Sequence, residues 1–93
     1  MENAGFGGQS PPENKLWYVY ILKCKYNKIY TGCTNNLEER IKRHNQGQVE
    51  ATKRLLPVSL STYIVFNNKY LAYDFERYLK SGSGRAFCQK RLI

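Results

Sequence analysis

Residues 28–47 read KIYTGCTNNLEERIKRHNQG and predict a strand that ends near a glycine and leads into a helix. Ile29 to Cys33 alternates β-branched and aromatic side chains, and Gly32 permits a tight exit or a close backbone approach. Asn36 is the expected N-cap, because an acidic residue follows three positions later as in a capping box, and Gly47 is a natural C-terminal stop. The rest of the chain is interpreted around this strand and helix.

The helix that follows carries polar residues on the face expected to point inward. At 3.6 residues per turn, Leu37, Arg40, Ile41 and His44 share one face. One interpretation is purely structural, with Arg40 extending along the core edge and His44 paired locally. The hydroxyl of Tyr30, one strand away, favours the other interpretation, a functional site.

The charge of the chain indicates which partners it favours. The 93 residues include 15 Lys and Arg against 7 Asp and Glu, a formal net charge of +8. A field of that sign on so small a domain favours polyanions, most often nucleic acid. The alternative is a ribosome-like or merely soluble basic protein.

Several classes of protein are not expected from the composition. There are three cysteines without a Cys-x-x-Cys pair, which indicates neither a disulfide framework nor a zinc site. No signal peptide or apolar run of the roughly 20 residues needed to span a bilayer is evident. We therefore expect a cytoplasmic protein with reduced thiols and no membrane partner.

The order of the remaining elements predicts one small α+β domain. Residues 1–14 are rich in Gly, Pro and polar side chains and are expected to form a disordered tail, with the domain spanning 15–93. Strands are predicted at 17–24, near the middle of the sheet, at 29–33 and at 58–66, and further helices at 69–80 and 85–92, with 81–84 as a break between them. The first two strands form an antiparallel hairpin. The fold class is a three-stranded antiparallel sheet flanked by helices.

Strand alternation brings two tyrosines toward each other. Tyr18, Tyr20 and Leu22 point to one face of the first strand. Tyr20 and Tyr30 can therefore lie near each other on that face. With eight tyrosines in the chain, most are expected to be ordinary half-buried strand residues.

Glu76 is the acidic residue expected closest to the core. It lies beside the apolar stripe of the 69–80 helix, formed by Ala72, Phe75 and Leu79. It can be a salt-bridge partner for the surrounding cations, which are Arg77, Lys80, Lys90 and Arg91. It can equally be a metal ligand, because one carboxylate with waters and phosphate oxygens is a common way to hold Mg²⁺.

Together these residues suit phosphodiester hydrolysis. Arg40 can bind a phosphate through two hydrogen bonds, and a metal on Glu76 can polarise a phosphoryl oxygen. The ordinary pKa of a histidine such as His44 lies near neutrality and suits a general base, whereas a tyrosine can act as the base only if neighbouring positive charge lowers its pKa. The positions of these side chains in the fold decide between them.

The order Tyr18-Val19-Tyr20, Tyr30-Thr31-Gly32, Arg40, His44 and Glu76 resembles the GIY-YIG nuclease superfamily. The resemblance spans roughly residues 17–92. It is closest to the small single-domain bacterial members, related to the catalytic domain of the excision-repair incision subunit and of some homing endonucleases. It implies the three-stranded sheet with helices described above and one divalent metal ion, Mg²⁺ or Mn²⁺.

The resemblance also implies roles for the matching residues. Tyr30 corresponds to the general base and Tyr20 to a positioning or proton-relay group. Arg40 corresponds to the arginine that stabilises the pentavalent phosphate, His44 to an assisting residue, and Glu76 to the metal ligand.

A basic loop and a C-terminal arginine are the expected nucleic-acid contacts. Thr52, Lys53 and Arg54 resemble a stretch of the small members that meets the substrate backbone, and Arg85 is a further candidate. Contacts of this kind give salt-sensitive, largely sequence-blind binding.

The chain departs from the family pattern at several positions. Tyr18 replaces the Gly and Thr31 the Ile of the family name. Cys33 stands where repair-type members carry Lys, and Gln89 is the nearest counterpart of an asparagine that some members place after the metal-binding helix.

The sequence thus predicts a metal-dependent endonuclease acting on DNA, in repair or in the processing of branched DNA. The alternatives are a nucleic-acid-binding module on the same fold with little or no cleavage, and an accessory subunit whose protein partner supplies targeting.

Overall fold

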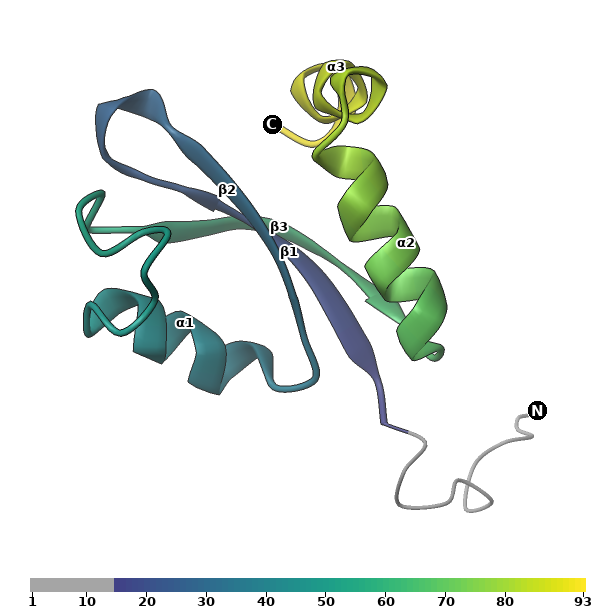
Figure 1. Ribbon diagram of the computed structural model, residues 1–93, viewed down its shortest axis with the longest axis horizontal. Helices are drawn as coiled ribbons and strands as arrows, with labels where there is room; N and C mark the ends of the chain where they lie inside the picture. The colour runs from purple at the N-terminus through teal and green to yellow at the C-terminus, as the bar shows by residue number, and fades with distance from the viewer. Residues whose placement is uncertain (1–14) are drawn as a thin grey trace.

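The computed structural model describes residues 15–93, so the prediction of a disordered tail at 1–14 lies outside the described residues. Its centre is an antiparallel sheet in the order β2-β1-β3 (Figure 1). The strands are β1 (Trp17–Lys23), β2 (Ile29–Thr34) and β3 (Ser59–Phe66). The predicted fold class and the central position of the first strand are confirmed, and the strand ends differ from prediction by one residue.

The hairpin between β1 and β2 fixes the register of the two tyrosine-bearing strands. Its turn is a short 3₁₀ segment, η1 (Lys25–Asn27), in which Tyr26 and Asn27 have positive φ angles of 61° and 58°. Across the ladder, Tyr20 lies opposite Gly32 and Leu22 opposite Tyr30. Tyr20 and Tyr30 therefore share one face of the sheet, as the alternation predicts.

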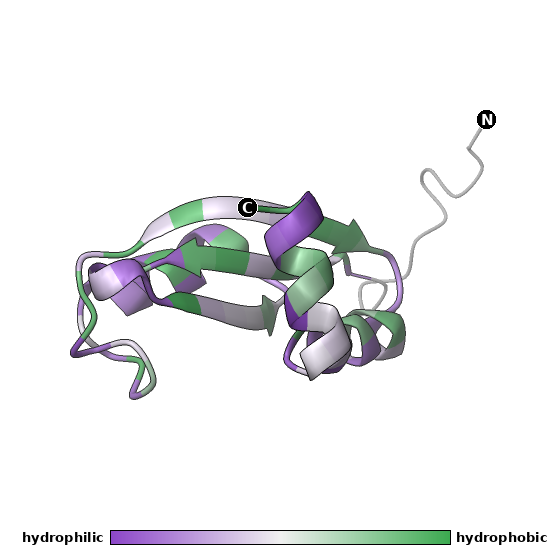
Figure 2. Cartoon of the chain, turned by 90° about the horizontal axis from the view of Figure 1, so that it is seen from above, coloured by the Kyte–Doolittle hydropathy of each residue, from purple (hydrophilic) through white to green (hydrophobic). Residues whose placement is uncertain are grey.

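Each face of the sheet has its own apolar cluster. On one face, Val19, Ile21 and Cys33 pack with Ala72, Leu79 and Cys88 of the two C-terminal helices. On the other, Tyr20, Leu22 and Val58 are buried against Leu37 and Ile41 of the first helix. The first helix and the two C-terminal helices thus lie on opposite sides of the sheet, as Figure 1 shows, and Figure 2 shows both apolar and polar segments along the strands.

Helix α1 (Leu37–Asn45) begins and ends where the capping signals predict. The Asn36 side chain accepts a hydrogen bond of 3.2 Å from the backbone N–H of Glu39. After the helix, Gly47 adopts a φ of 75°, a left-handed conformation that glycine enters without a Cβ penalty. The helix is therefore held in register with the strand before it.

The junction between α2 (Lys69–Leu79) and α3 (Gly82–Arg91) differs from the prediction. A break was expected over residues 81–84, but α3 already begins at Gly82, and the Ser81 hydroxyl accepts a hydrogen bond from the Gly84 N–H. Gly84 is buried inside the helix, and only glycine fits there because a Cβ would overlap the carbonyl oxygen of Tyr78. The glycine allows α3 to pack against the end of α2.

Within residues 15–93, no helix combines the length and apolar character needed to cross a membrane.

Candidate active site

Three aromatic rings from three different elements meet on the α1 side of the sheet. The ring centroids of Tyr20 and Tyr30 are 6.2 Å apart, and His44 of α1 lies 5.7 Å from Tyr20 and 5.1 Å from Tyr30. Tyr20 and His44 are fully buried, whereas Tyr30 is half-buried. The structure thus brings together both tyrosines and the histidine that the sequence singled out.

His44 is held by a hydroxyl group on each side of its ring. Its Nε2 lies 2.9 Å from the Tyr20 hydroxyl, and its Nδ1 lies 2.7 Å from the Thr52 hydroxyl. The tautomer of the ring decides which nitrogen donates, and a neutral ring satisfies both bonds, because each hydroxyl can donate or accept. Both ring nitrogens are therefore engaged within the protein.

Thr52 was expected to contact nucleic acid, and this expectation is wrong for its side chain. Thr52 is fully buried, and its hydroxyl is the partner of His44. Lys53 and Arg54, which follow it, are exposed, and Lys53 forms an ion pair of 3.1 Å with Glu50. The loop thus has one inward residue that orients His44 and two outward cations.

Tyr20 keeps its proton at neutral pH. Its pKa is raised to about 12, mainly by burial and to a smaller extent by Tyr30, while a hydrogen bond and the charge of Arg40 act in the opposite direction. Its ring and hydroxyl lie directly over Gly32, where a Cβ would collide with them. The glycine that follows Tyr30 and Thr31 therefore makes room for the Tyr20 hydroxyl.

Arg40 and Glu76 bring opposite charges to the same region. The pKa of Cys33 is raised to about 11, mainly by burial and also by the charge of Glu76, while the charge of Arg40 acts in the opposite direction. The same two side chains act on the pKa of Tyr20. Arg40 is half-buried on α1 and Glu76 half-buried on α2, so the two helices deliver these charges from opposite sides of the hairpin.

The pKa of His44 is lowered from its ordinary value of 6.5. Burial is the main cause, and the positive charges of Arg40 and Arg43 add to it. A neutral imidazole between two hydroxyls is therefore the form present near pH 7.

Lys80 belongs to the cluster, although the sequence indicated it only as one possible salt-bridge partner. Its Nζ lies 3.1 Å from Oε2 of Glu76 and 5.5 Å from the centroid of the Tyr30 ring. Arg77, another expected partner, pairs with Asp74 instead. The spacing of four residues between Glu76 and Lys80 is the signal that could have identified this pair.

The donors available for a metal ion fit a hard, strongly hydrated cation. Within residues 15–93 no group of three or more His, Cys, Asp or Glu side chains is positioned to bind one. Glu76 is the carboxylate beside the two tyrosines, and 18% of its side chain is exposed. One carboxylate completed by water and substrate oxygens suits Mg²⁺ or Mn²⁺ and does not suit zinc.

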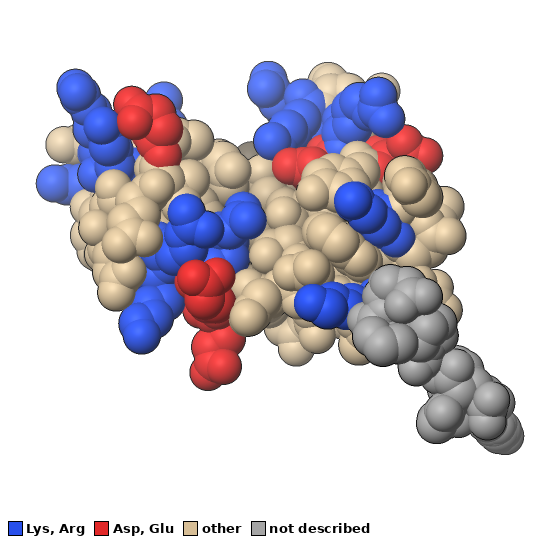
Figure 3. Space-filling model, turned by 60° about the horizontal axis from the view of Figure 1, so that its bottom comes forward, with Lys and Arg blue, Asp and Glu red and all other residues tan. Residues whose placement is uncertain are grey.

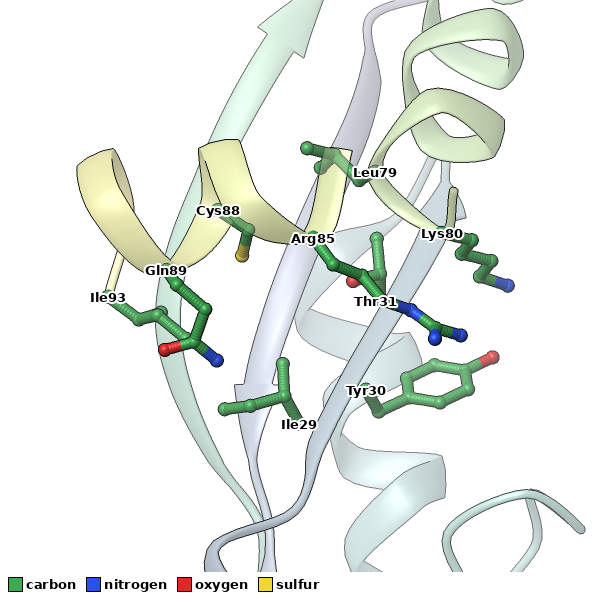
Figure 4. A pocket seen from close by; sticks show the side chains of 9 residues that line it. All are labelled: Ile29, Tyr30, Thr31, Leu79, Lys80, Arg85, Cys88, Gln89 and Ile93. Carbon is green, nitrogen blue, oxygen red and sulfur yellow. The ribbon is translucent and has the colours of Figure 1, made fainter. Parts of the chain in front are cut away.

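Arg85 lies next to this cluster. In Figure 4 its side chain extends from α3 toward Lys80 and the Tyr30 ring, and all three line one pocket. Lys53 and Arg54 are exposed and directly follow Thr52 in the turn segment after α1. Figure 3 shows Lys and Arg side chains in separate groups around a less charged centre on one face.

Two tyrosines, an arginine, a histidine and a glutamate thus lie in one region of the structure, on both sides of the hairpin of β1 and β2. Residues 16–90 match the family model described as the GIY-YIG catalytic domain, and the chain belongs to this nuclease family.

Curated relatives agree with the family assignment. A UPF0213 protein of Clostridium perfringens is 52% identical over 64 residues, which cover 68% of this chain and 69% of that protein. A UPF0213 protein of Staphylococcus haemolyticus is 45% identical over 67 residues, 71% of this chain and 82% of the relative.

The fold has a solved counterpart. The solution NMR structure of a UPF0213 protein from Bacillus halodurans superposes with a TM-score of 0.52 at 36% identity, covering 81% of each chain. The α+β fold is therefore shared with this structure.

Proposed function

We propose that this protein is a Mg²⁺- or Mn²⁺-dependent endonuclease that hydrolyses phosphodiester bonds in DNA. The observation that carries the proposal is the convergence of Tyr20, Tyr30, His44 and Glu76 from four elements at one place, with Arg40 acting on the same groups. These side chains supply the proton acceptor, the cation and the carboxylate that the reaction needs.

The geometry favours Tyr30 over His44 as the general base. His44 has no exposed surface, and both of its nitrogens already bond to protein hydroxyls, so a water molecule cannot reach them. Tyr30 is half-buried and lies beside Lys80 and Glu76. Tyr30 accepts the proton of the attacking water, and His44 acts as a positioning residue for Tyr20.

Arg40 and Lys80 bind the phosphate. The Arg40 guanidinium donates two parallel hydrogen bonds to phosphate oxygens. Lys80 adds a compact positive charge on the Tyr30 side, and it compensates for Cys33 at a position where repair-type members of the family carry lysine. The two cations neutralise charge that accumulates on the phosphate during attack.

Glu76 is the residue that would hold the metal ion. A bound ion would supply a Lewis acid for a phosphoryl oxygen or the departing oxygen. Lys80, which pairs with the Glu76 carboxylate in this structure, is close enough to this position to contribute its charge to phosphate binding.

The substrate is bound mainly through its backbone. Lys53, Arg54 and Arg85 are exposed cations around the site, and the net charge of +8 steers a polyanion toward it. We propose a cytoplasmic role in the repair or processing of branched DNA, with a protein partner supplying the choice of substrate.

The ion pair between Glu76 and Lys80 favours a second candidate function. A carboxylate neutralised by a neighbouring ammonium, at 3.1 Å, is a ready-made structural contact. In that case the protein binds nucleic acid, or serves a partner enzyme, without cleaving.

The test is cleavage of labelled duplex, branched and single-stranded DNA with Mg²⁺ or Mn²⁺. Wild type is compared with Tyr30→Phe, and Tyr63→Phe on the exposed part of β3 is the matched control. We expect cleavage by wild type and Tyr63→Phe and none by Tyr30→Phe, with DNA binding equal in all three. Full activity in Tyr30→Phe removes Tyr30 as the base, and binding without cleavage by wild type favours the second function.

A further inference from the structure

A pocket of about 380 Å³ lies on the other side of Tyr30 from the His44 cluster. It opens between β2, the end of α2 and α3, and Figure 4 shows the side chains that line it. Its volume falls within the roughly 300–1,000 Å³ range of small-molecule sites. The pocket is therefore large enough to hold a ligand.

The walls of the pocket have two different chemistries. Its floor is formed by Thr31, Leu79 and Cys88, each less than 10% exposed. Its rim carries Lys80 and Arg85 on the Tyr30 side and the Gln89 amide on α3. Ile29 and Ile93 complete the apolar lining. A floor that is apolar apart from the Thr31 hydroxyl, one amide and two cations suit a planar ring that carries a hydrogen-bonding edge and is attached to an anion.

The pocket shares two residues with the candidate active site. Tyr30 lines the pocket and contacts the His44 ring, and Lys80 lines the pocket and pairs with Glu76. A molecule in the pocket would thus lie next to the position proposed for the scissile phosphate. On a nucleic-acid strand, the group that lies next to a phosphate is a nucleotide.

We propose that this pocket receives one unstacked nucleotide of the substrate strand, adjacent to the phosphate that is cleaved. This inference rests on the proposed function for its choice of ligand. The base lies against Leu79, Cys88 and Ile93, the Gln89 amide hydrogen-bonds to the base edge, and Arg85 binds the flanking phosphate. Moving a nucleotide out of the base stack costs the least free energy where that nucleotide is already unpaired. The site therefore favours DNA with an unpaired nucleotide over perfect duplex.

The first test measures binding of deoxyadenosine monophosphate without metal by shifts of backbone amide NMR signals. We expect saturable shifts at Thr31, Cys88 and Ile93 that inorganic phosphate alone does not reproduce. Arg85→Ala should weaken this binding about tenfold, because it removes a charged hydrogen-bond partner. Arg91→Ala, an equivalent change on α3 outside the pocket lining, should leave it unchanged.

The second test compares the binding of two DNAs. One carries 2-aminopurine as a single unpaired nucleotide, and the other is the perfect duplex. The bulky variant Ile93→Trp should remove the preference for the unpaired nucleotide and leave duplex binding intact. Shifts that phosphate alone reproduces, or a preference that survives Ile93→Trp and Arg85→Ala, would overturn the proposal.

The two proposals fail separately. Nucleotide binding in the pocket without DNA cleavage supports the pocket and contradicts the endonuclease. Cleavage that depends on Tyr30, with no nucleotide shifts in the pocket, supports the endonuclease and overturns the pocket.

Discussion

At the scale of single residues, the hydroxyl of Thr52 has a structural role that the basic loop around it does not indicate. It lies 2.7 Å from Nδ1 of His44, and His44 in turn lies 2.9 Å from the Tyr20 hydroxyl. All three side chains are fully buried. A buried polar chain of this kind fixes side-chain orientation as long as every member keeps its partner.

Replacing Thr52 by valine should destabilise the fold. The change keeps the shape of the side chain but leaves Nδ1 of His44 without its partner, at a cost of about 1–3 kcal/mol in the free energy of unfolding. Urea unfolding measures the loss, and Thr52→Ser, which keeps the hydroxyl, should retain most of the stability. DNA affinity should be unchanged in Thr52→Val; a large loss of affinity in a folded variant would restore Thr52 as a direct contact.

The stability of the protein should fall as the pH drops below about 6.5. The pKa of buried His44 is lowered from 6.5, so the unfolded chain takes up a proton there that the folded chain does not. The stability that depends on neutral His44 is fully present above pH 6.5. It is lost as the pH falls from 6.5 toward the lower pKa that His44 has in the folded protein, and the free energy of unfolding falls by at most about 1.4 kcal/mol per pH unit.

Urea unfolding at pH 7.5, 6.5 and 5.5 measures this slope. His44 is the single histidine of the chain, so no other histidine contributes. His44→Gln should flatten the slope in this range. An equal slope in His44→Gln would show that another group is responsible.

At the scale of elements, the contact between α2 and α3 positions Arg85 and Lys80 beside Tyr30. The contact depends on the lack of a side chain at Gly84, whose place is filled by the Tyr78 carbonyl. Gly82, two residues earlier in α3, has open space around its Cβ position. The two glycines therefore have different roles.

Gly84→Ala should destabilise the protein by about 1–3 kcal/mol, because the backbones of α2 and α3 must move apart. Gly82→Ala should be neutral or stabilise by up to about 1 kcal/mol, because it only restricts the unfolded chain. Thermal unfolding of both variants provides the comparison. Equal melting temperatures would contradict the close packing at Gly84.

The sequence predicted most elements to within a residue, because their signals are local. Asn36 and Asn68 cap α1 and α2 with their side chains, and strand alternation placed Tyr20 and Tyr30 on one face. The start of α3 was wrong because glycine near a helix end is read as a breaker. Here Gly84 is required by a neighbouring backbone, which local patterns do not reveal.

The residues of the candidate site could be predicted from the sequence, but the side chains that they contact could not. Periodicity directed Arg40, His44 and Glu76 inward, and the motif order supplied the tyrosines. Thr52 was assigned to the wrong side of its loop because one buried hydroxyl in a polar turn has no periodic signature. The contact of Lys80 with Tyr30 joins α2 to β2, and helical spacing alone does not specify such a contact.

At the scale of the whole molecule, the chain carries an excess of positive charge. The net charge is +8, and Figure 3 shows Lys and Arg side chains in several groups on one face. A surface of this kind binds phosphates and releases their counterions, so affinity falls steeply with salt.

Lys53→Ala and Arg54→Ala should each reduce the salt dependence of duplex binding. Each lost phosphate contact lowers the slope of log K against log salt concentration by about 0.9. Fluorescence anisotropy over a salt series measures the slope. Arg77→Ala removes an exposed cation on α2 that is ion-paired with Asp74, as Lys53 is with Glu50, but that lies outside the loop, so it should change the slope least. An equal change in all three variants would remove the loop from the interface.

The most direct test of the account is the single-turnover cleavage rate of one bound DNA substrate over a Mg²⁺ series. Wild type is compared with Glu76→Gln and with Asp74→Asn, a matched change on the exposed side of α2. The account predicts that Glu76→Gln loses cleavage at every Mg²⁺ concentration while its affinity for DNA is kept, and that Asp74→Asn behaves as wild type. Undiminished cleavage in Glu76→Gln would contradict the assignment of Glu76 as the metal ligand and with it the proposed mechanism.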